Sequence, residues 1–149
     1  MRHFLFAALA GAMGLVLAVG CAKEETTRAE QGMAPVQSDQ ASRGQQLYAA
    51  DCAKCHGGDG KGTKEAPPVV GQGALPLDPP AGAKFRKSQF HTAKDVLEFV
   101  QRNMPADKPG SLSNGDYESI LAFALKANGV ELQSEPLSSA NAASYVLHP

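Results

Sequence analysis

The chain of 149 residues lacks several features that mark common classes of protein. No alternation of apolar and polar residues runs long enough to build a β-sheet, so the sequence predicts an all-α fold. The longest uncharged apolar run, residues 4–19, falls short of the roughly 20 residues that cross a bilayer. The net charge is only −1 at pH 7, and we therefore expect no nucleic-acid partner.

Cysteine is also scarce, with three in the whole chain. No second Cys or His pair stands at the spacing of a zinc site, and no βαβ pattern surrounds the one C-x-x-C. That pair belongs to a C-x-x-C-H element, in which His56 follows Cys52 and Cys55 directly. Such an element is the attachment site of a c-type haem, because each thiol can add to one vinyl group of a porphyrin. His56 is then placed to bind the iron, which predicts one haem c held covalently through Cys52 and Cys55.

A sixth iron ligand can be sought among the four methionines. Those at positions 1, 13 and 33 lie in the apolar N-terminal stretch or in the polar segment after it, which leaves Met104. Pro105 bars helix continuation and favours an extended conformation at Met104, from which the thioether could turn to the iron. Methionine also fills gaps in protein cores, and His91 is the main rival as a ligand.

Residues 1–20 read as an export signal of the lipoprotein type, since a charged start precedes the apolar run and a small residue precedes Cys21. Cys21 would then carry the lipid, although Ala18 stands where such signals usually have Leu. An uncleaved anchor or plain secretion is the alternative. We expect the protein on the periplasmic side of a bacterial membrane, lipid-anchored or else soluble. Residues 21–40 read as a flexible tether.

The predicted haem domain spans residues 41–130 and contains three helical patterns. The first covers about 40–50. The second begins after Thr92 with Asp95 three residues on, and buries apolar residues in the stretch 96–100. The third begins after Ser113 with Asp116 in the same relation, and ends at Asn128 and Gly129. The loop 57–89 is rich in Gly and Pro and needs the haem as apolar surface.

Residues 43–129, with the motifs above, resemble a class I mono-haem cytochrome c. The likeness rests on residues 44–48, 52–57, 66–68, 103–105 and 117–123. It implies short helices wrapped around one haem, with Gly44 and Tyr48 of the first helix packed against Ile120 and Phe123 of the last. It also implies that a prolyl carbonyl, of Pro67 or Pro68, accepts the second ring N–H of His56. A weaker likeness, in residues 104–113 and 127–129, is to haem domains that accompany quinoprotein alcohol dehydrogenases.

These observations predict a one-electron carrier with His56 and Met104 as axial ligands, and not an enzyme. Its partners would be a redox donor and acceptor, such as a quinoprotein dehydrogenase or a terminal oxidase. A haem-bearing subunit of a dehydrogenase or oxidase complex and a gas-binding sensor are the alternatives. The absence of a second C-x-x-C-H argues against an exported bacterial peroxidase.

Two further regions are less informative. Residues 41–130 hold eleven Lys and Arg against nine Asp and Glu, with basic clusters at 54–64 and 84–87. These clusters form either a weak positive rim at the haem edge or an ordinary solvated surface. The tail, residues 131–149, either wraps the domain or hangs loose.

Overall fold

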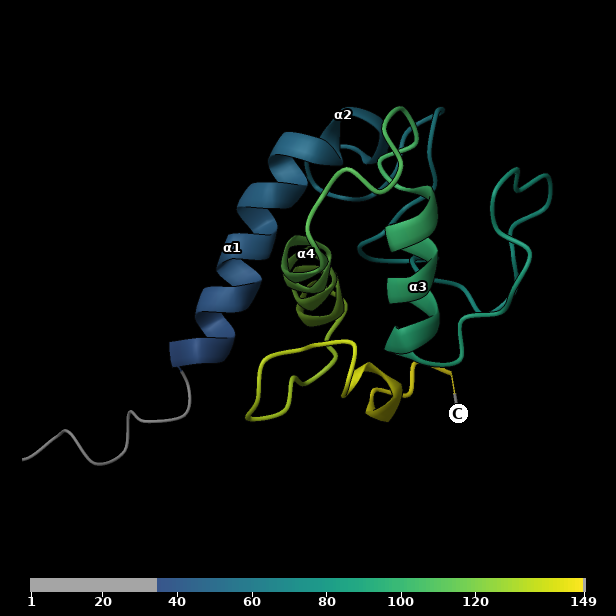
Figure 1. Ribbon diagram of the computed structural model, residues 1–149. Helices are drawn as coiled ribbons and strands as arrows, with labels where there is room; N and C mark the ends of the chain where they lie inside the picture. The colour runs from purple at the N-terminus through teal and green to yellow at the C-terminus, as the bar shows by residue number, and fades with distance from the viewer. Residues whose placement is uncertain (1–34, 149) are drawn as a thin grey trace, which may run out of the picture.

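A computed structural model describes residues 35–148, and of residues 35–38 the backbone alone. The predicted export signal, Cys21 and most of the tether lie outside this range. The elements are α1 (Pro35–Asp51), α2 (Ala53–His56), α3 (Ala93–Asn103), α4 (Asn114–Ala127) and a short 3₁₀ turn, η1 (Ala142–Ser144) (Figure 1). The part described contains no strand, only an isolated bridge between Thr92 and Val146. The all-α prediction is confirmed.

Helix α1 begins five residues before the predicted start, inside the segment read as tether. Pro35 is tolerated there because the first turn of a helix leaves its N–H groups unpaired in any case. The Gln40 side chain exchanges two hydrogen bonds with the backbone of Leu137, at 2.8 and 2.9 Å. This contact across 97 residues fixes the first half of α1 to the tail.

Helices α1 and α4 cross at close range (Figure 1). A Cβ atom added to Gly44 would lie 1.8 Å from the carbonyl oxygen of Ser119, so only glycine permits the approach. One turn on, the rings of Tyr48 and Phe123 are 5.3 Å apart between centroids. The helix contact implied by the resemblance is therefore present.

Both predicted capping arrangements are present. The Thr92 backbone N–H donates to Asp95 Oδ2 at 2.8 Å, and Ser113 Oγ donates to Asp116 Oδ2 at 2.7 Å. Helix α4 ends with Gly129 at φ 79°, in the left-handed conformation expected of it. Each carboxylate also lies near the positive end of its helix dipole, which stabilises the first turn.

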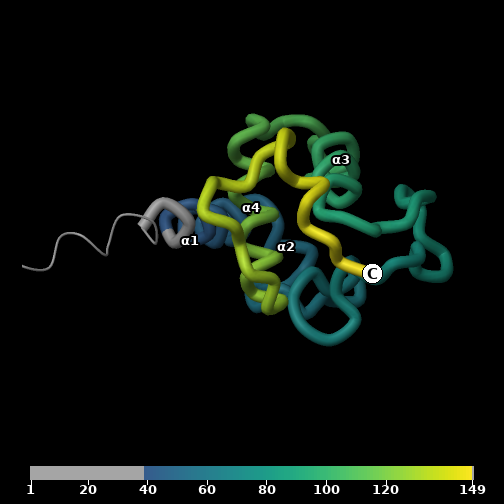
Figure 2. Tube along the Cα trace, turned by 90° about the horizontal axis from the view of Figure 1, so that it is seen from below, coloured from purple at the N-terminus to yellow at the C-terminus, as the bar shows by residue number. Residues whose placement is uncertain are grey.

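The tail packs onto the helices. Leu137, Ala142 and Tyr145 are buried in one core with side chains of α3 and α4. Ala93 N–H donates to the Tyr145 carbonyl at 2.9 Å, which joins the start of α3 to this segment. Seen from below, the tail crosses α4 and continues to α3 (Figure 2). The tail thus belongs to the folded domain, which runs to at least His148.

No helix within residues 35–148 combines the length and the apolar character needed to cross a membrane.

Candidate haem site

The C-x-x-C-H element forms one helical turn directly after α1. Cys52 N–H donates to the Tyr48 carbonyl at 2.9 Å, and His56 N–H donates to the Cys52 carbonyl at 3.0 Å. This turn places the two cysteines and His56 around one wall of a cavity. Cys52 and Cys55 are not joined by a disulfide, so both thiols are available for another bond.

The imidazole of His56 is held in a defined orientation. Its Nδ1 lies 2.7 Å from the carbonyl oxygen of Pro67. A carbonyl can only accept, so Nδ1 carries the proton and Nε2 keeps a free lone pair for a metal. Of the two prolines that the resemblance left open, Pro67 makes the contact. Gly62 N–H donates to the His56 carbonyl at 2.8 Å, which also ties the loop to the histidine.

The cavity has a volume of about 830 Å³. Its walls come from the end of α1, from α2, α3 and α4, and from the loops between them. Residues that reach it from distant parts of the chain are Cys52, Cys55, His56, Pro67, Leu75, Arg86, Phe99, Met104 and Leu112. The four residues predicted from the sequence to bind the cofactor, Cys52, Cys55, His56 and Met104, are therefore brought together on one cavity.

Met104 has an extended backbone, with φ −120° and ψ 153°, as predicted from Pro105. Its N–H donates to the Val100 carbonyl at 2.9 Å, and its carbonyl accepts the Tyr117 hydroxyl at 2.6 Å. Tyr117 is buried, so this contact is sheltered from water. The rival ligand His91 is exposed, lies outside the cavity lining and contacts Gln89 at 3.0 Å.

Several apolar side chains expected in the core are only half-buried. Val96 and Leu97 are buried as predicted, whereas Phe99, Val100 and Ile120 are intermediate. The last three all line the cavity. The exposed parts of these three side chains therefore lie against a cavity large enough for a cofactor. This explains why their helical spacing predicts that they are buried.

The lysines of the two basic clusters are exposed as predicted, and one member of the clusters is not. Lys54 lies 3.8 Å from Asp107, and Lys61 lies 3.4 Å from Asp59, so both charges have an acidic neighbour. Arg86 is not at the surface but buried. The prediction of a basic cluster on the surface is therefore wrong for Arg86, because its guanidinium binds backbone carbonyls within the loop.

Burial changes the proton affinity of two groups near the motif. Burial, reinforced by the Asp51 carboxylate, raises the pKa of the Cys52 thiol to about 11. Burial and the neighbouring charges of Cys52 and Asp59 raise the pKa of Tyr48 to about 12. At neutral pH both groups are protonated, and the Tyr48 hydroxyl donates to the Gly57 carbonyl at 2.7 Å.

Three polar side chains that support the site were not assigned this role from the sequence. Thr63 donates to the Cys55 carbonyl at 2.6 Å, and Tyr117 binds Met104 as described. Asn128 bridges α4 to the loop: its Nδ2 donates to the Val69 carbonyl, and its Oδ1 accepts the Gly71 N–H, both at 2.9 Å. From the sequence, the position of Asn128 at the end of a helix predicts only that it ends the helix, and not that it binds the loop.

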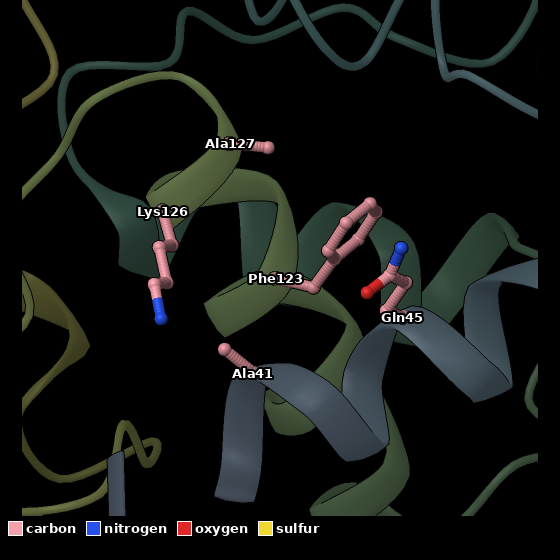
Figure 3. A pocket seen from close by; sticks show the side chains of 5 residues that line it. All are labelled: Ala41, Gln45, Phe123, Lys126 and Ala127. Atoms are coloured by element: carbon pink, nitrogen blue, oxygen red, sulfur yellow. The ribbon is translucent and has the colours of Figure 1, made fainter. Parts of the chain in front are cut away.

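The residues present fit a c-type haem. The cavity falls in the range of about 300–1,000 Å³ common for small-molecule and cofactor sites, and its walls are largely apolar. It offers two free thiols, an imidazole with an oriented lone pair and a thioether, which are the groups that hold a haem c. A second, smaller hollow between α1 and α4 is lined by Ala41, Gln45, Phe123, Lys126 and Ala127 and contains none of these groups (Figure 3).

Comparison with known proteins agrees with this site. Residues 39–123 match the family described as cytochrome C oxidase, cbb3-type, subunit III. A thiosulfate dehydrogenase of Stutzerimonas stutzeri (strain A1501) is 33% identical over 87 residues, which are 55% of this chain and 25% of that protein. The crystal structure of the sulfane dehydrogenase SoxCD from Paracoccus pantotrophus matches with a TM-score of 0.55 and 31% identity, over 72% of this chain and 52% of that one.

The chain thus spans about a quarter of the curated relative and about half of the solved chain that it matches. The resemblance to class I cytochromes c and the predicted fold are confirmed, and electron transfer is the supported kind of function. The matched family covers more than half of the sequence and includes the C-x-x-C-H element and Met104. The chain therefore belongs to the family of c-type cytochrome domains described as cytochrome C oxidase, cbb3-type, subunit III.

Proposed function

We propose that the protein is a one-electron carrier whose haem is attached through Cys52 and Cys55 and ligated by His56 and Met104. The observation that supports this most directly is that these four residues, from separate segments, line one cavity. The bound haem would supply one-electron exchange between ferric and ferrous iron. The proposed activity is not an enzymatic one.

The protein's own contacts favour rapid exchange without rearrangement. The Pro67 carbonyl fixes the His56 ring, and the Tyr117 hydroxyl and the Val100 carbonyl fix the backbone of Met104. Two ligands held in this way stay in place in both oxidation states, which keeps the structural change on electron transfer small. A thioether ligand also raises the reduction potential relative to two imidazoles.

We propose a dehydrogenase as the electron donor. The two relatives are a thiosulfate dehydrogenase and a sulfane dehydrogenase, and the chain matches only part of each. Because the chain matches only part of each dehydrogenase, a haem-bearing subunit in a stable dehydrogenase complex is the second candidate. Affinity capture of the full chain from its own membranes distinguishes them, because a stoichiometric partner supports the subunit and a lone cytochrome supports a free carrier.

The proposed location is the periplasmic side of a bacterial membrane, with a lipid on Cys21. The sequence of residues 1–21 supports it, and these residues lie outside the described part of the chain. Cys21→Ser should move the protein from the membrane fraction to the soluble periplasm and abolish labelling by radioactive palmitate. Membrane retention without the label would favour an uncleaved apolar anchor.

The visible spectrum tests the axial ligands. The ferric protein should show the weak sulfur-to-iron band at the red end, and the reduced protein should not bind carbon monoxide. Met104→Ala should lose the band, bind carbon monoxide when reduced and have a lower potential, while the haem stays covalently attached. Met33→Ala is the matched control and should behave as the wild type.

The opposite result would change the assignment. A wild-type protein that lacks the band and binds carbon monoxide readily has an open or labile sixth site. Ligand sensing would then rank ahead of electron transfer.

A further inference from the structure

Three consecutive carbonyl groups in the loop between α2 and α3 are bound by side chains from other positions. Arg86 Nη2 donates to the Pro76 carbonyl at 2.6 Å and also to the Leu77 carbonyl. His148 Nε2 lies 2.8 Å from the Leu75 carbonyl oxygen, and since a carbonyl can only accept, Nε2 carries the proton. This last contact comes from the tail, 73 positions further along the chain, which reaches the loop past the start of α3 (Figure 2).

Leu75 has a backbone conformation that leucine rarely adopts. Its φ is 45°, and within the described part of the chain it is the only residue other than glycine with a positive φ. At such an angle the Cβ atom of an L-residue crowds the following carbonyl oxygen, and Pro76 next to it favours an extended backbone instead. A residue strained in this way persists only where surrounding contacts hold it. The hydrogen bond from His148 is such a contact.

The side chain of Leu75 lies between the core and the cavity. It packs against the buried cluster formed by α3, α4 and the tail, and it also lines the cavity that contains His56 and Met104. The backbone conformation of Leu75 therefore decides whether an apolar side chain closes this part of the wall. His148 does not line the cavity, so it acts there only through Leu75.

The residues just before His148 fix its place. Leu147 N–H donates to the His91 carbonyl at 2.8 Å, and Val146 forms the isolated bridge with Thr92. His148 thus follows directly on a segment bound to the start of α3. Little backbone freedom remains to be lost when its imidazole binds the loop.

We propose that His148 is a positioning residue of the cofactor site, which holds Leu75 in the left-handed conformation so that the leucine side chain closes one wall of the haem cavity. The inference rests on the proposed function in requiring a bound haem. An apolar wall keeps water from the haem, and ferric iron, with its additional positive charge, loses more by this exclusion than ferrous iron. The closed wall therefore raises the reduction potential.

The test compares His148→Ala and His148→Gln with the control His91→Ala, each in the full, haem-loaded chain. Glutamine keeps an N–H donor for the Leu75 carbonyl but removes the imidazole and its titration. His91→Ala removes an imidazole that contacts Gln89 and not the loop carbonyl. A change that appears only in His148→Ala therefore belongs to the lost hydrogen bond and not to the lost ring.

The measurements are the reduction potential and amide hydrogen exchange in the reduced protein. Exchange at Ala74, whose N–H donates to the Gly71 carbonyl at 3.0 Å, reports on the turn just before Leu75. Exchange at Ala93, whose N–H donates to the Tyr145 carbonyl, reports whether the tail stays bound to α3.

We expect His148→Ala to accelerate exchange at Ala74 by about two- to tenfold, the factor that the loss of one hydrogen bond gives, and to leave Ala93 unchanged. Its reduction potential should fall, because water reaches the haem when Leu75 leaves its position. His148→Gln should stay close to the wild type in both measurements, and His91→Ala should match it.

An unchanged potential in His148→Ala would overturn the proposal whatever the exchange at Ala74, because His148 would then be a purely structural residue. Equal acceleration at Ala74 and Ala93 would overturn it as well, since the tail would have detached as a whole. A His148→Gln variant that behaves like His148→Ala would exclude the hydrogen bond as the cause. The sulfur-to-iron band of the wild type is read separately, so failure of the axial assignment remains distinguishable.

Discussion

Residues 57–89 and the helices α3 and α4 differ in what covers their apolar side chains. In the helices, Val96, Leu97, Leu121 and Leu125 are buried against one another and against the tail. In the loop, no apolar side chain is buried in the described structure. Its shape depends instead on polar contacts, such as the Gly60 carbonyl that accepts the N–H groups of both Val69 and Val70.

The two regions therefore obtain their apolar contacts from different sources. The helices obtain a core from the polypeptide alone, while many loop side chains face the cavity. A haem there would supply the missing apolar contact for the loop, so the cofactor acts as the core of one half of the domain. Changes at the cavity should therefore affect the loop first, and changes at the helix crossing should affect the whole molecule.

The largest effect is expected from the double variant Cys52→Ala/Cys55→Ala. Without covalent haem the apolar cavity walls meet water, and we expect a loss of at least about 5 kcal/mol, comparable with the whole stability of a small domain. Amide hydrogen exchange should rise most in residues 57–89 and least in α4. Equal protection of loop and helices in the haem-free protein would contradict the division described above.

Gly44→Ala should come next. A Cβ atom there would lie 1.8 Å from the Ser119 carbonyl oxygen, so α1 and α4 must separate, at a cost of about 3 kcal/mol in the free energy of unfolding. Gly115→Ala is the matched control in α4, since nothing lies within 4 Å of its added Cβ. It should be neutral or stabilising by up to about 1 kcal/mol in denaturant unfolding. Equal effects of the two changes would rule out close packing as the reason for Gly44.

Asn128→Ala should have a moderate and local effect. It removes the hydrogen bonds to Val69 and Gly71, which connect the loop to α4, at a net cost of about 1–2 kcal/mol. Exchange of the Gly71 amide should accelerate. Asn141→Ala, which removes a similar pair of contacts within the tail, should cost about as much without changing that amide. Slow exchange at Gly71 in Asn128→Ala would show that the loop needs no such connection.

The smallest effect concerns the ion pair between Asp116 of α4 and Arg43 of α1, 2.5 Å apart. The Ser113 hydroxyl, and then Arg43, hold the pKa of Asp116 below its ordinary value of 3.8. Because the folded pKa is depressed, this stabilisation is full above pH 3.8 and disappears as the pH falls through the lower folded value. Asp116→Asn should flatten stability against pH in that acidic window and cost less than about 1 kcal/mol at pH 7, measured by urea unfolding. An identical acid slope in both proteins would exclude Asp116 as a contributor.

Local signals in the sequence predicted the helical half well. The pairs Thr92 with Asp95 and Ser113 with Asp116 fixed both helix starts, because capping acts within one turn. The C-x-x-C-H element likewise specified its site, and Pro105 indicated the extended conformation of Met104. Such features depend on neighbours a few residues away, which a single sequence displays.

Contacts between distant segments could not be predicted in the same way. In the sequence, Arg86 is indistinguishable from the basic residues Lys84 and Lys87 beside it. Its contacts with backbone carbonyls depend on how the loop folds and so could not be predicted. Leu137 and Tyr145 lie in a tail without apolar periodicity, so the sequence pattern does not predict that they are buried. The polar residues after Pro35 give a weak helical pattern, so the sequence predicts the start of α1 about five residues too late.

The reciprocal contact between Gln40 and Leu137 also orders events in time. A ribosome working at about 5–20 residues per second makes Leu137 roughly 5–20 s after Gln40, since 97 positions separate them. The shared core remains incomplete until Tyr145 has followed. Until then residues 52–56 belong to a domain whose core is incomplete. A truncation before Leu137 would therefore remove Leu137, Ala142 and Tyr145 from the core and leave Gln40 without its contact.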